Sequence, residues 1–268
     1  MNQAEQNSTP PPIDTSRPHP ARMYDYYLGG KDNYPVDSQA AERVVSLFPE
    51  IKTGARINRT FMNRACRLLA DRGIRQFLDV GTGIPTAPNL HQVAQKVAPS
   101  ARVVYVDNDP IVLRHAEALL RSTPEGRTGY IQADAREPER IIEGAGKILD
   151  LDQPVALSMV ALLHFLSDEH RPHDLVNRLL DALPSGSHLV LSHVTGDFDP
   201  ETWEKIVGIY RESGVPAQVR SRAEFTRFFE GLELLEPGVQ VATDWRPEPG
   251  DQKPHSPVPL YVGVARKP

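Results

Sequence analysis

The feature that most constrains this fold is a regular alternation of short apolar segments and amphipathic segments from residue 76 onward. Residues 103–106, Val-Val-Tyr-Val, are typical of the apolar segments, which predict strands buried on both faces of a sheet. The segments between them have the helical period and predict covering helices. A strand and helix repeat of this kind predicts an α/β fold with a doubly wound, mostly parallel sheet.

The expected strands cover residues 76–80, 102–107, 128–132, 154–159, 188–193, 232–241 and 259–265, and the expected helices cover 87–97, 110–121, 137–145, 168–183, 200–213 and 222–230. The last two strands are joined by residues 243–257, which lack a helical pattern, so we expect them to pair antiparallel at the sheet edge. Ligands of such sheets bind beyond the carboxyl ends of the strands, which is where we expect the site.

The N-terminal part of the chain predicts a different organisation. Residues 1–20 hold five of the 25 prolines and few apolar side chains, so we expect a disordered tail. Residues 21–73 predict a helical cover, with helices at 38–48 and 54–72 and a break at 28–35. Since 268 residues suit one domain with extensions, we assign residues 74–268 to a single ligand-binding core.

Composition excludes several classes of protein. The net charge of −5 argues against a general nucleic-acid binder, which would carry a basic surplus. Cys66 is the single cysteine, so no intramolecular disulfide can form and a cytoplasmic location is expected. The sequence has no apolar run of membrane-spanning length and no signal-peptide pattern at its N-terminus, so no membrane partner is expected. Composition gives no oligomeric state.

The strongest local signal is the strand 76–80, which ends in Asp79 and a turn containing Gly81 and Gly83. Glycines let the backbone approach a ligand closely, and the next helix offers free N–H groups. No Gly-Lys-Ser/Thr follows, which excludes a phosphate-binding loop. Pro85 and Thr86 occupy the region where a dinucleotide fold needs its third glycine, and Asp79 favours a cationic ligand over a pyrophosphate.

Two further strands also run into acids. Asp107 ends the strand at 102–107, where its carboxylate can accept both hydroxyls of a ribose. Its alternative role is a helix N-cap, which Asn108 or Asp109 would fill equally well. Asp134 follows the strand at 128–132 and can accept a hydrogen bond from an adenine amino group or, equally, cap the next helix.

With these residues in place, the chain resembles class I S-adenosylmethionine (SAM)-dependent methyltransferases, and more closely an actinobacterial family catalogued as DUF574. The resemblance covers about residues 20–266 and rests on the segments 22–34, Arg-Met-Tyr-Asp-Tyr-Tyr-Leu-Gly-Gly-Lys-Asp-Asn-Tyr; 58–61, Asn-Arg-x-Phe; 76–86; and 103–110. It implies a Rossmann-like seven-stranded sheet with an antiparallel last strand, and SAM as cofactor. The candidate SAM-binding residues are Tyr24, Tyr27, Gly29, Gly30, Lys31, Asn33, Asp79, Gly81, Thr82, Gly83, Asp107, Asn108, Asp134, Ala135, Ser158 and Met159.

The segment 24–34 has two interpretations. As a lid over SAM, its Lys31 or Asn33 would meet the aminoacyl carboxylate, and a tyrosine face would meet the sulfonium. As a purely structural element, Gly29 and Gly30 would end a helix and the tyrosines would pack in a hinge. The residues alone favour the structural role, whereas the resemblance favours the lid.

Methyl transfer from a sulfonium needs positioning and water exclusion, with a general base where the acceptor is a hydroxyl or an ammonium. His164 follows the fourth strand and His193 ends the fifth, so both are candidate catalytic bases, with wall residues as the alternative role. Ser158 and Met159 are expected near the methyl group. No metal site is expected, because the cluster around His170 and His173 reads as a solvated helix start.

The functional prediction is a SAM-dependent methyltransferase with an unidentified small-molecule acceptor. The small-molecule part rests on the charge and on two missing motifs after strand four, Asn/Asp-Pro-Pro-aromatic and Pro-Cys. Two alternatives remain open at this point. One is a SAM-binding regulatory or accessory protein without turnover, and the other is an NAD(P)-dependent oxidoreductase, which Pro85 and Thr86 disfavour.

Overall fold

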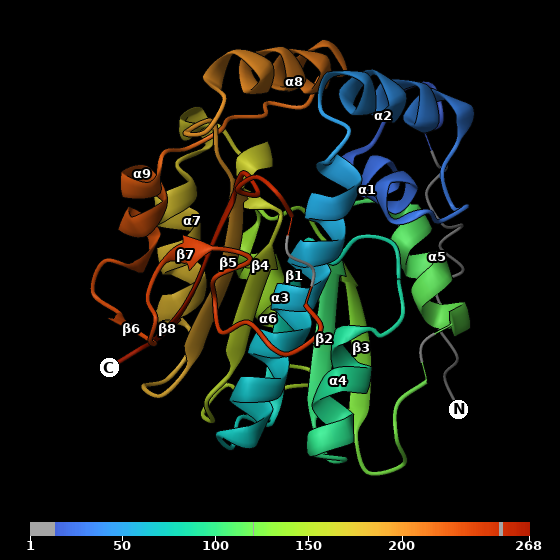
Figure 1. Cartoon of the computed structure of the whole chain (residues 1–268). Helices are drawn as coiled ribbons and strands as arrows, with labels where there is room; N and C mark the ends of the chain where they lie inside the picture. The colour runs from blue at the N-terminus through green and yellow to red at the C-terminus, as the bar shows by residue number, and fades with distance from the viewer. Residues whose placement is uncertain (1–13, 120, 252–253) are drawn as a thin grey trace, which may run out of the picture.

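The structure is a computed structural model that describes residues 14–119, 121–251 and 254–268. Within these residues eight strands form one sheet in the order β3-β2-β1-β4-β5-β8-β6, with β7 also paired to β8 (Figure 1). The strands are β1 (Gln76–Val80), β2 (Arg102–Asp107), β3 (Arg127–Gln132), β4 (Ala156–Val160), β5 (His188–Val194), β6 (Glu233–Leu234), β7 (Gln240–Val241) and β8 (Leu260–Arg266). Strands β1 to β5 are parallel, and β8 runs antiparallel to β5, β6 and β7.

The described helices are α1 (Pro20–Leu28), α2 (Pro35–Leu47), α3 (Ile51–Asp71), α4 (Leu90–Val97), α5 (Pro110–Leu119), α6 (Pro138–Ala145), α7 (Pro172–Asp181), α8 (Pro200–Glu212) and α9 (Arg222–Thr226), with short 3-10 turns η1 (Leu163–Phe165), η2 (Asp168–His170) and η3 (Arg227–Phe229). Six of the described α-helices begin with proline. Proline suits the first helical position because its fixed φ is helical and its missing N–H would be unpaired there. Six of the 25 prolines thus mark where described helices begin.

The sheet is covered on both faces because its strands alternate between two cores. Phe77, Val103 and Tyr105 pack beneath α3 and α4 on one face. Leu78 and Val106 belong to the other core, which α6, α7 and α9 cover. Each central strand is therefore buried at nearly every position, as the sequence indicates.

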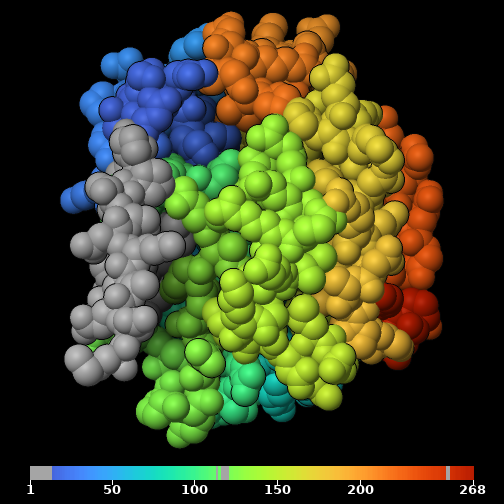
Figure 2. Space-filling model, turned by 180° about the vertical axis from the view of Figure 1, so that it is seen from behind, coloured from blue at the N-terminus to red at the C-terminus, as the bar shows by residue number. Residues whose placement is uncertain are grey.

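Helices α1 and α2 pack with α8 to form a cap above the carboxyl ends of the parallel strands (Figure 1). From behind, the N-terminal helices in blue and α8 in orange make up one end of the molecule (Figure 2). Met23, Tyr27, Val44, Trp203 and Ile206 are buried between these helices. Segments that are more than 150 residues apart in sequence thus enclose the space above the sheet.

The predicted α/β class, with a mostly parallel sheet and an antiparallel edge, is confirmed. The predicted strand 232–241 is wrong as one element, because Pro237 and Gly238, with φ of 79°, separate β6 from β7. The predicted helix 168–183 is divided at Arg171, which has a left-handed φ of 50° and is followed by Pro172. Proline cannot continue a preceding helix, so the second part starts anew as α7.

Most of the predicted tail, residues 1–13, lies outside the described residues, and residues 14–19 lead into α1 without regular structure. Helix α3 contacts the sheet as well as the cap, since it packs against β4, β5 and β8 and also against α1 and α2. The boundary between a cover at 21–73 and a core at 74–268 stays a prediction.

Candidate functional site

A cavity of about 330 Å³ lies beyond the carboxyl ends of β1, β2, β3 and β4, and we call it the strand-end cavity. Its wall combines the glycine turn after β1, the residues that follow β2, β3 and β4, and parts of α1 and α3. Of the predicted SAM-binding residues, those in its wall are Tyr24, Asp79, Gly81, Thr82, Gly83, Asp107, Asn108, Asp134 and Ala135. The structure thus brings together the strand-end acids that the sequence identified separately.

The glycine turn folds back onto the end of β2. The N–H groups of Gly81 and Thr82 donate to the carbonyl of Val106, at 2.8 and 3.1 Å. Gly81 and Gly83 have φ values of 75° and 68°, which favour glycine. A Cβ on Gly81 would lie 2.6 Å from a methyl carbon of Leu162, so this position has no room for a side chain.

Asp107 joins this turn to the end of β2. One carboxylate oxygen accepts from the Gly83 N–H at 2.8 Å and the other from the Asp109 N–H at 3.0 Å. Each oxygen retains a second lone pair that a ribose hydroxyl can use. Burial raises the pKa of Asp107, and the two backbone hydrogen bonds partly oppose this rise because they favour the ionised carboxylate. The predicted capping role belongs to Asp109, whose carboxylate accepts from the N–H of Ile111.

The other two acids differ in their environment. Asp79 is 5% exposed, and burial raises its pKa. A cationic ligand nearby would oppose that shift. The carboxylate of Asp134 instead accepts from the guanidinium of Arg136 at 2.7 and 2.8 Å, which lowers its pKa to about 2. Asp134 is therefore ionised and already holds a cation at the cavity wall.

The wall supplied by β4 lies slightly beyond the predicted residues. Ser158 and Met159 are buried within the strand at 3% and 0% exposure and line neither cavity described here. The chain reaches the strand-end cavity at Val160, Ala161 and Leu162. The predicted strand stopped at residue 159, whereas β4 continues to Val160, so the sequence put the exit from the sheet too early.

Helix α1 closes one side of the strand-end cavity, with His19, Pro20, Ala21 and Tyr24 in its wall. A buried ion pair holds the helix in position, because the guanidinium of Arg22 donates to both oxygens of Asp109 at 2.7 and 3.2 Å. Both side chains are less than 5% exposed, and the carboxylate of Asp37 lies 4.0 Å from Arg22. The cap is thus tied directly to the loop that carries Asp107.

Residues 29–33 of the predicted lid fold onto Asp25 and line neither cavity. Gly29 ends α1 with φ of 84°, and the N–H of Gly30 donates to the Asp25 carbonyl at 2.9 Å. The amide of Asn33 donates to the Asp25 carboxylate at 2.8 Å, and Lys31 is exposed. In this arrangement the segment forms the helix end that the sequence offered as its structural role. Contact of Gly29, Gly30, Lys31 and Asn33 with SAM stays a prediction.

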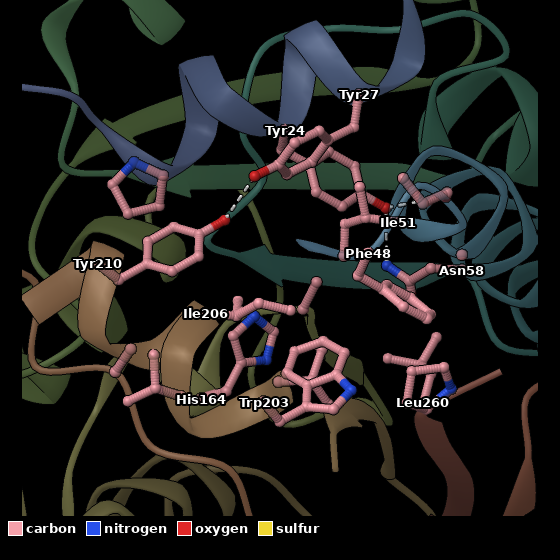
Figure 3. A pocket seen from close by; sticks show the side chains of 18 of the residues that line it. Tyr24, Tyr27, Phe48, Ile51, Asn58, His164, Trp203, Ile206, Tyr210 and Leu260 are labelled. Atoms are coloured by element: carbon pink, nitrogen blue, oxygen red, sulfur yellow. Dashed lines mark hydrogen bonds between the residues drawn. The ribbon is translucent and has the colours of Figure 1, made fainter. Parts of the chain in front are cut away.

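A second cavity of about 80 Å³ lies between the cap and the strand ends, and we call it the apolar cavity. Figure 3 shows its side chains, among them the rings of Phe48, Trp203 and Tyr210. The hydroxyls of Tyr27 and Tyr210 form a hydrogen bond of 3.1 Å with each other, which satisfies both in an apolar wall. None of the described residues in this wall is an Asp, Glu, Lys or Arg.

The two cavities share one wall, to which Pro20, Tyr24, Asn58, Ala161 and Phe165 contribute. In this wall the amide nitrogen of Asn58 donates to the Tyr24 hydroxyl at 2.9 Å, and that hydroxyl donates to the Ala55 carbonyl at 3.0 Å. The Tyr24 hydroxyl gives its single proton to the Ala55 carbonyl, so toward Asn58 it can only accept a hydrogen bond. The nitrogen of the Asn58 amide must therefore face this hydroxyl. The Asn58 amide oxygen, buried and without a partner among the described residues, remains free to accept a hydrogen bond.

The two candidate bases lie in different surroundings. His164 lines the apolar cavity, and its Nδ1 is buried without a partner among the described residues. His193 is fully buried and lines neither cavity. Its Nδ1 pairs with the Val194 carbonyl at 2.7 Å, and its Nε2 lies 2.9 Å from the Arg220 guanidinium. Arg220 can only donate, so Nε2 is the acceptor and has no free lone pair.

Sequence reasoning missed the role of Arg59. This side chain lies in the wall of the strand-end cavity, and its guanidinium donates to the carbonyl of Pro88 at 2.8 Å and to that of Thr86 at 2.5 Å. It therefore orients the loop after the glycine turn and presents a cation to the cavity. Arg59 belongs to the segment 58–61 on which the resemblance rests, and that was the one available signal.

Among the described residues, no group of three or more His, Cys, Asp or Glu side chains has the arrangement of a metal site. The described helices also include none with the length and apolar character needed to cross a membrane.

Comparisons with known proteins agree with this geometry. The family model described as S-adenosyl methyltransferase matches residues 6–268. A crystal structure of a DUF574 family protein from Streptomyces avermitilis is 47% identical, with a TM-score of 0.93 over 96% of this chain and 100% of that one. A Thermobifida fusca protein, solved as a candidate methyltransferase, is 40% identical, with a TM-score of 0.87 over 97% and 99% of the two chains. Comparison with curated proteins gave no match.

More distant structures share the fold. The plantazolicin methyltransferase BpumL, solved with a triazolic desmethylPZN analogue and S-adenosylhomocysteine (SAH), has a TM-score of 0.55 at 12% identity, over 92% of this chain and 95% of that one. The chain belongs to the S-adenosyl methyltransferase family. It is a class I SAM-dependent methyltransferase, and its cofactor is SAM.

Proposed function

We propose that the chain transfers the methyl group of SAM to a small-molecule acceptor that binds in the apolar cavity. The observation that carries this proposal is the wall shared by the two cavities at Tyr24, Asn58, Ala161 and Phe165. A ligand in the strand-end cavity and a ligand in the apolar cavity would meet across this wall. Their reacting atoms could then be aligned for an in-line displacement, which is the main requirement of methyl transfer.

The charged groups and hydrogen-bonding groups of the strand-end cavity match those of SAM. Asp107 keeps free lone pairs for the ribose hydroxyls, and Asp79 favours a nearby cation such as the sulfonium. Arg59 supplies the cation that an aminoacyl carboxylate needs, a part that the sequence had assigned to Lys31 or Asn33. The free amide oxygen of Asn58 suits the α-ammonium group. When bound, SAM supplies the activated methyl group.

The residues of this chain then do the positioning. The buried pair of Arg22 and Asp109 fixes α1 over the cavity, and α1 excludes water from the shared wall. The glycine turn at Gly81 allows the backbone to approach the ligand closely. The apolar cavity, with its aromatic wall, suits a compact organic acceptor better than a nucleic acid.

Calorimetric titration with SAM, SAH and NAD tests the cofactor part of the proposal. We expect SAM and SAH to bind with one site per chain and NAD to show no binding. Incorporation of tritiated methyl from SAM into a small-molecule extract of the native host tests turnover. Binding of NAD in place of SAM, or labelling of nucleic acid alone, would contradict the proposal.

A further inference from the structure

We propose that the methyl acceptor is an uncharged, ring-bearing molecule that presents a hydroxyl group to the imidazole of His164, and that His164 takes the hydroxyl proton during transfer. This inference rests on the proposed function, because it assigns the occupant of the apolar cavity and the atom that is methylated. Three features of that cavity carry it: its lack of charge, its aromatic wall and its unpaired imidazole.

The lack of charge excludes ionic acceptors. The described wall of the apolar cavity has no carboxylate to pair with an ammonium group and no lysine or arginine to pair with a carboxylate or phosphate. A charged group buried there would lose its hydration without compensation, which costs several kcal/mol. An uncharged acceptor meets no such cost.

The aromatic wall and the size favour a single ring. Phe48, Trp203 and Tyr210 supply flat apolar faces around the cavity (Figure 3). Its volume of about 80 Å³ is smaller than a cavity of roughly 150 Å³ that encloses a benzene molecule. A single ring is therefore the largest occupant that the size allows, and it would fill the apolar cavity as the side chains of the wall move apart, with its substituent directed toward the wall shared with the strand-end cavity.

Among the described residues of this wall, two polar side chains have a buried atom without a partner: Asn58, in the wall shared with the strand-end cavity, and His164. His164 is 7% exposed, its Nδ1 has no hydrogen bond within the described residues, and its ring lies among the cavity side chains in Figure 3. The two tyrosine hydroxyls at Tyr27 and Tyr210 satisfy each other. A hydroxyl on the ligand would supply the partner that His164 lacks.

The electrostatic surroundings keep His164 neutral. Burial, together with the charge of Arg220, lowers the pKa of His164 to about 3. The other titratable groups nearby are His193, whose ring centroid is 5.4 Å away, and the phenols of Tyr24, Tyr27 and Tyr210, whose pKa values burial raises. Asp168 pairs with the Arg220 guanidinium at 2.6 Å. His164 therefore has a lone pair available throughout the neutral range.

The chemical step balances with the residues and ligands named. The acceptor oxygen attacks the methyl carbon and forms the new C–O bond, while the C–S bond breaks and its electron pair stays on sulfur, giving SAH. The proton of the hydroxyl passes to a nitrogen of His164, and the imidazolium returns it to water. A base of low pKa is weak toward a free phenol, but the methylated oxonium is far more acidic than an imidazolium, so transfer late in the step is favourable.

Three single-ring probes test the charge and shape of the cavity: p-cresol, benzoate and benzylammonium. Each is titrated calorimetrically into the protein saturated with SAH. We expect p-cresol to bind and the two ions to bind about 100-fold more weakly. Ala217→Phe fills the cavity and should abolish p-cresol binding with an unchanged Kd for SAM, and Ala217→Val should weaken it in the same direction if the larger variant does not fold. Equal binding of an ionic probe, or p-cresol binding that neither variant changes, would overturn the proposal.

The role of His164 is tested by the methylation of p-cresol. We expect His164→Gln to lower kcat about 100-fold with an unchanged Kd for SAM. The matched variant is His188→Gln, which changes a buried histidine at the first residue of β5, at the end of that strand away from the cavities, and it should retain the rate. The rate of the native protein should be flat from about pH 6 to about pH 9, and that of His164→Gln should rise with pH as phenolate forms. A flat profile in both proteins, or equal losses in both variants, would remove His164 from the step. Failure of SAM to bind would instead refute the proposed function.

Discussion

The two cavities differ in how the chain builds them. The strand-end cavity is made mainly of local segments, each a strand followed directly by its acid or glycine turn, and backbone N–H groups hold Asp107 in place. The apolar cavity is made of side chains from helices α1, α3 and α8, from Phe48 after α2, and from residues after β4, at the end of β5 and at the start of β8, so its parts are far apart in sequence. Outside the shared residues, side chains of the apolar cavity can therefore change without disturbing the segments that form the strand-end cavity.

The position of the cap above both cavities depends first on the buried ion pair of Arg22 and Asp109. Arg22→Ala leaves Asp109 and Asp37 buried without their cation, so we expect a loss of about 3–5 kcal/mol in the free energy of unfolding, measured by urea denaturation. The matched control is Arg43→Ala, which breaks the exposed pair with Glu212 and should cost less than about 1 kcal/mol. Similar losses in both variants would mean that the buried pair does not hold the cap.

The second test affects the strand-end cavity alone. Asp107→Ala removes the acceptor proposed for the ribose hydroxyls, so we expect SAM affinity to fall by about 1.5–3 kcal/mol in a calorimetric titration. The same carboxylate satisfies two backbone donors, so the unfolding transition is measured alongside as a check on the fold. The control is Asp152→Ala, which changes an exposed residue shortly before β4, at the amino ends of the parallel strands, and should leave SAM affinity unchanged. Unaltered affinity in Asp107→Ala would remove this residue from the site.

The third test affects the apolar cavity alone. Tyr27→Phe removes one member of the Tyr27 and Tyr210 hydrogen bond and leaves the other hydroxyl unpaired in an apolar wall. We expect a loss of about 1 kcal/mol in the free energy of unfolding and an unchanged Kd for SAM. If the affinity for SAM falls together with the stability, the two cavities are coupled and are not independent parts of the structure.

The smallest expected effect is a pH dependence in the strand-end cavity. Arg136 lowers the pKa of Asp134 to about 2, below its unfolded value near 3.9, so this pair stabilises the fold above about pH 4 and the contribution disappears as pH falls through about 2. Partial exposure limits the contribution to less than about 1 kcal/mol. Carbon NMR of the Asp134 carboxyl should show a midpoint near pH 2 in the native protein and an ordinary one in Arg136→Ala. Equal midpoints would show that the pair does not form in solution.

The sequence predicted the sheet well because local patterns determine it. Strands β1 and β2 have the predicted bounds, since their buried residues are continuous and their ends carry Asp79 and Asp107. The grouping of these acids also followed, because parallel strands bring their carboxyl ends to one edge. Errors arose where backbone geometry decides, as at Pro237 with Gly238 and at Arg171.

The apolar cavity was beyond sequence reasoning for a physical reason. Its residues share no spacing, and the pairing of α2 with α8 depends on tertiary packing between Phe48 and Trp203, whose ring centroids are 5.9 Å apart. The lid hypothesis likewise could not foresee that the Asp25 carboxylate would accept hydrogen bonds from the Asp32 N–H and from the side-chain amide of Asn33. Of the lid residues proposed, Tyr24 lines both cavities and Tyr27 lines the apolar one.

The central claim is that SAM and its acceptor meet at the wall shared by the two cavities, and a crystal structure of the complex with SAH tests it most directly. The account predicts that the ribose contacts Asp107 and that the sulfur atom lies beside Tyr24 and Asn58, facing the apolar cavity. A sulfur atom directed away from that wall, or SAH bound outside the strand-end cavity, would contradict it.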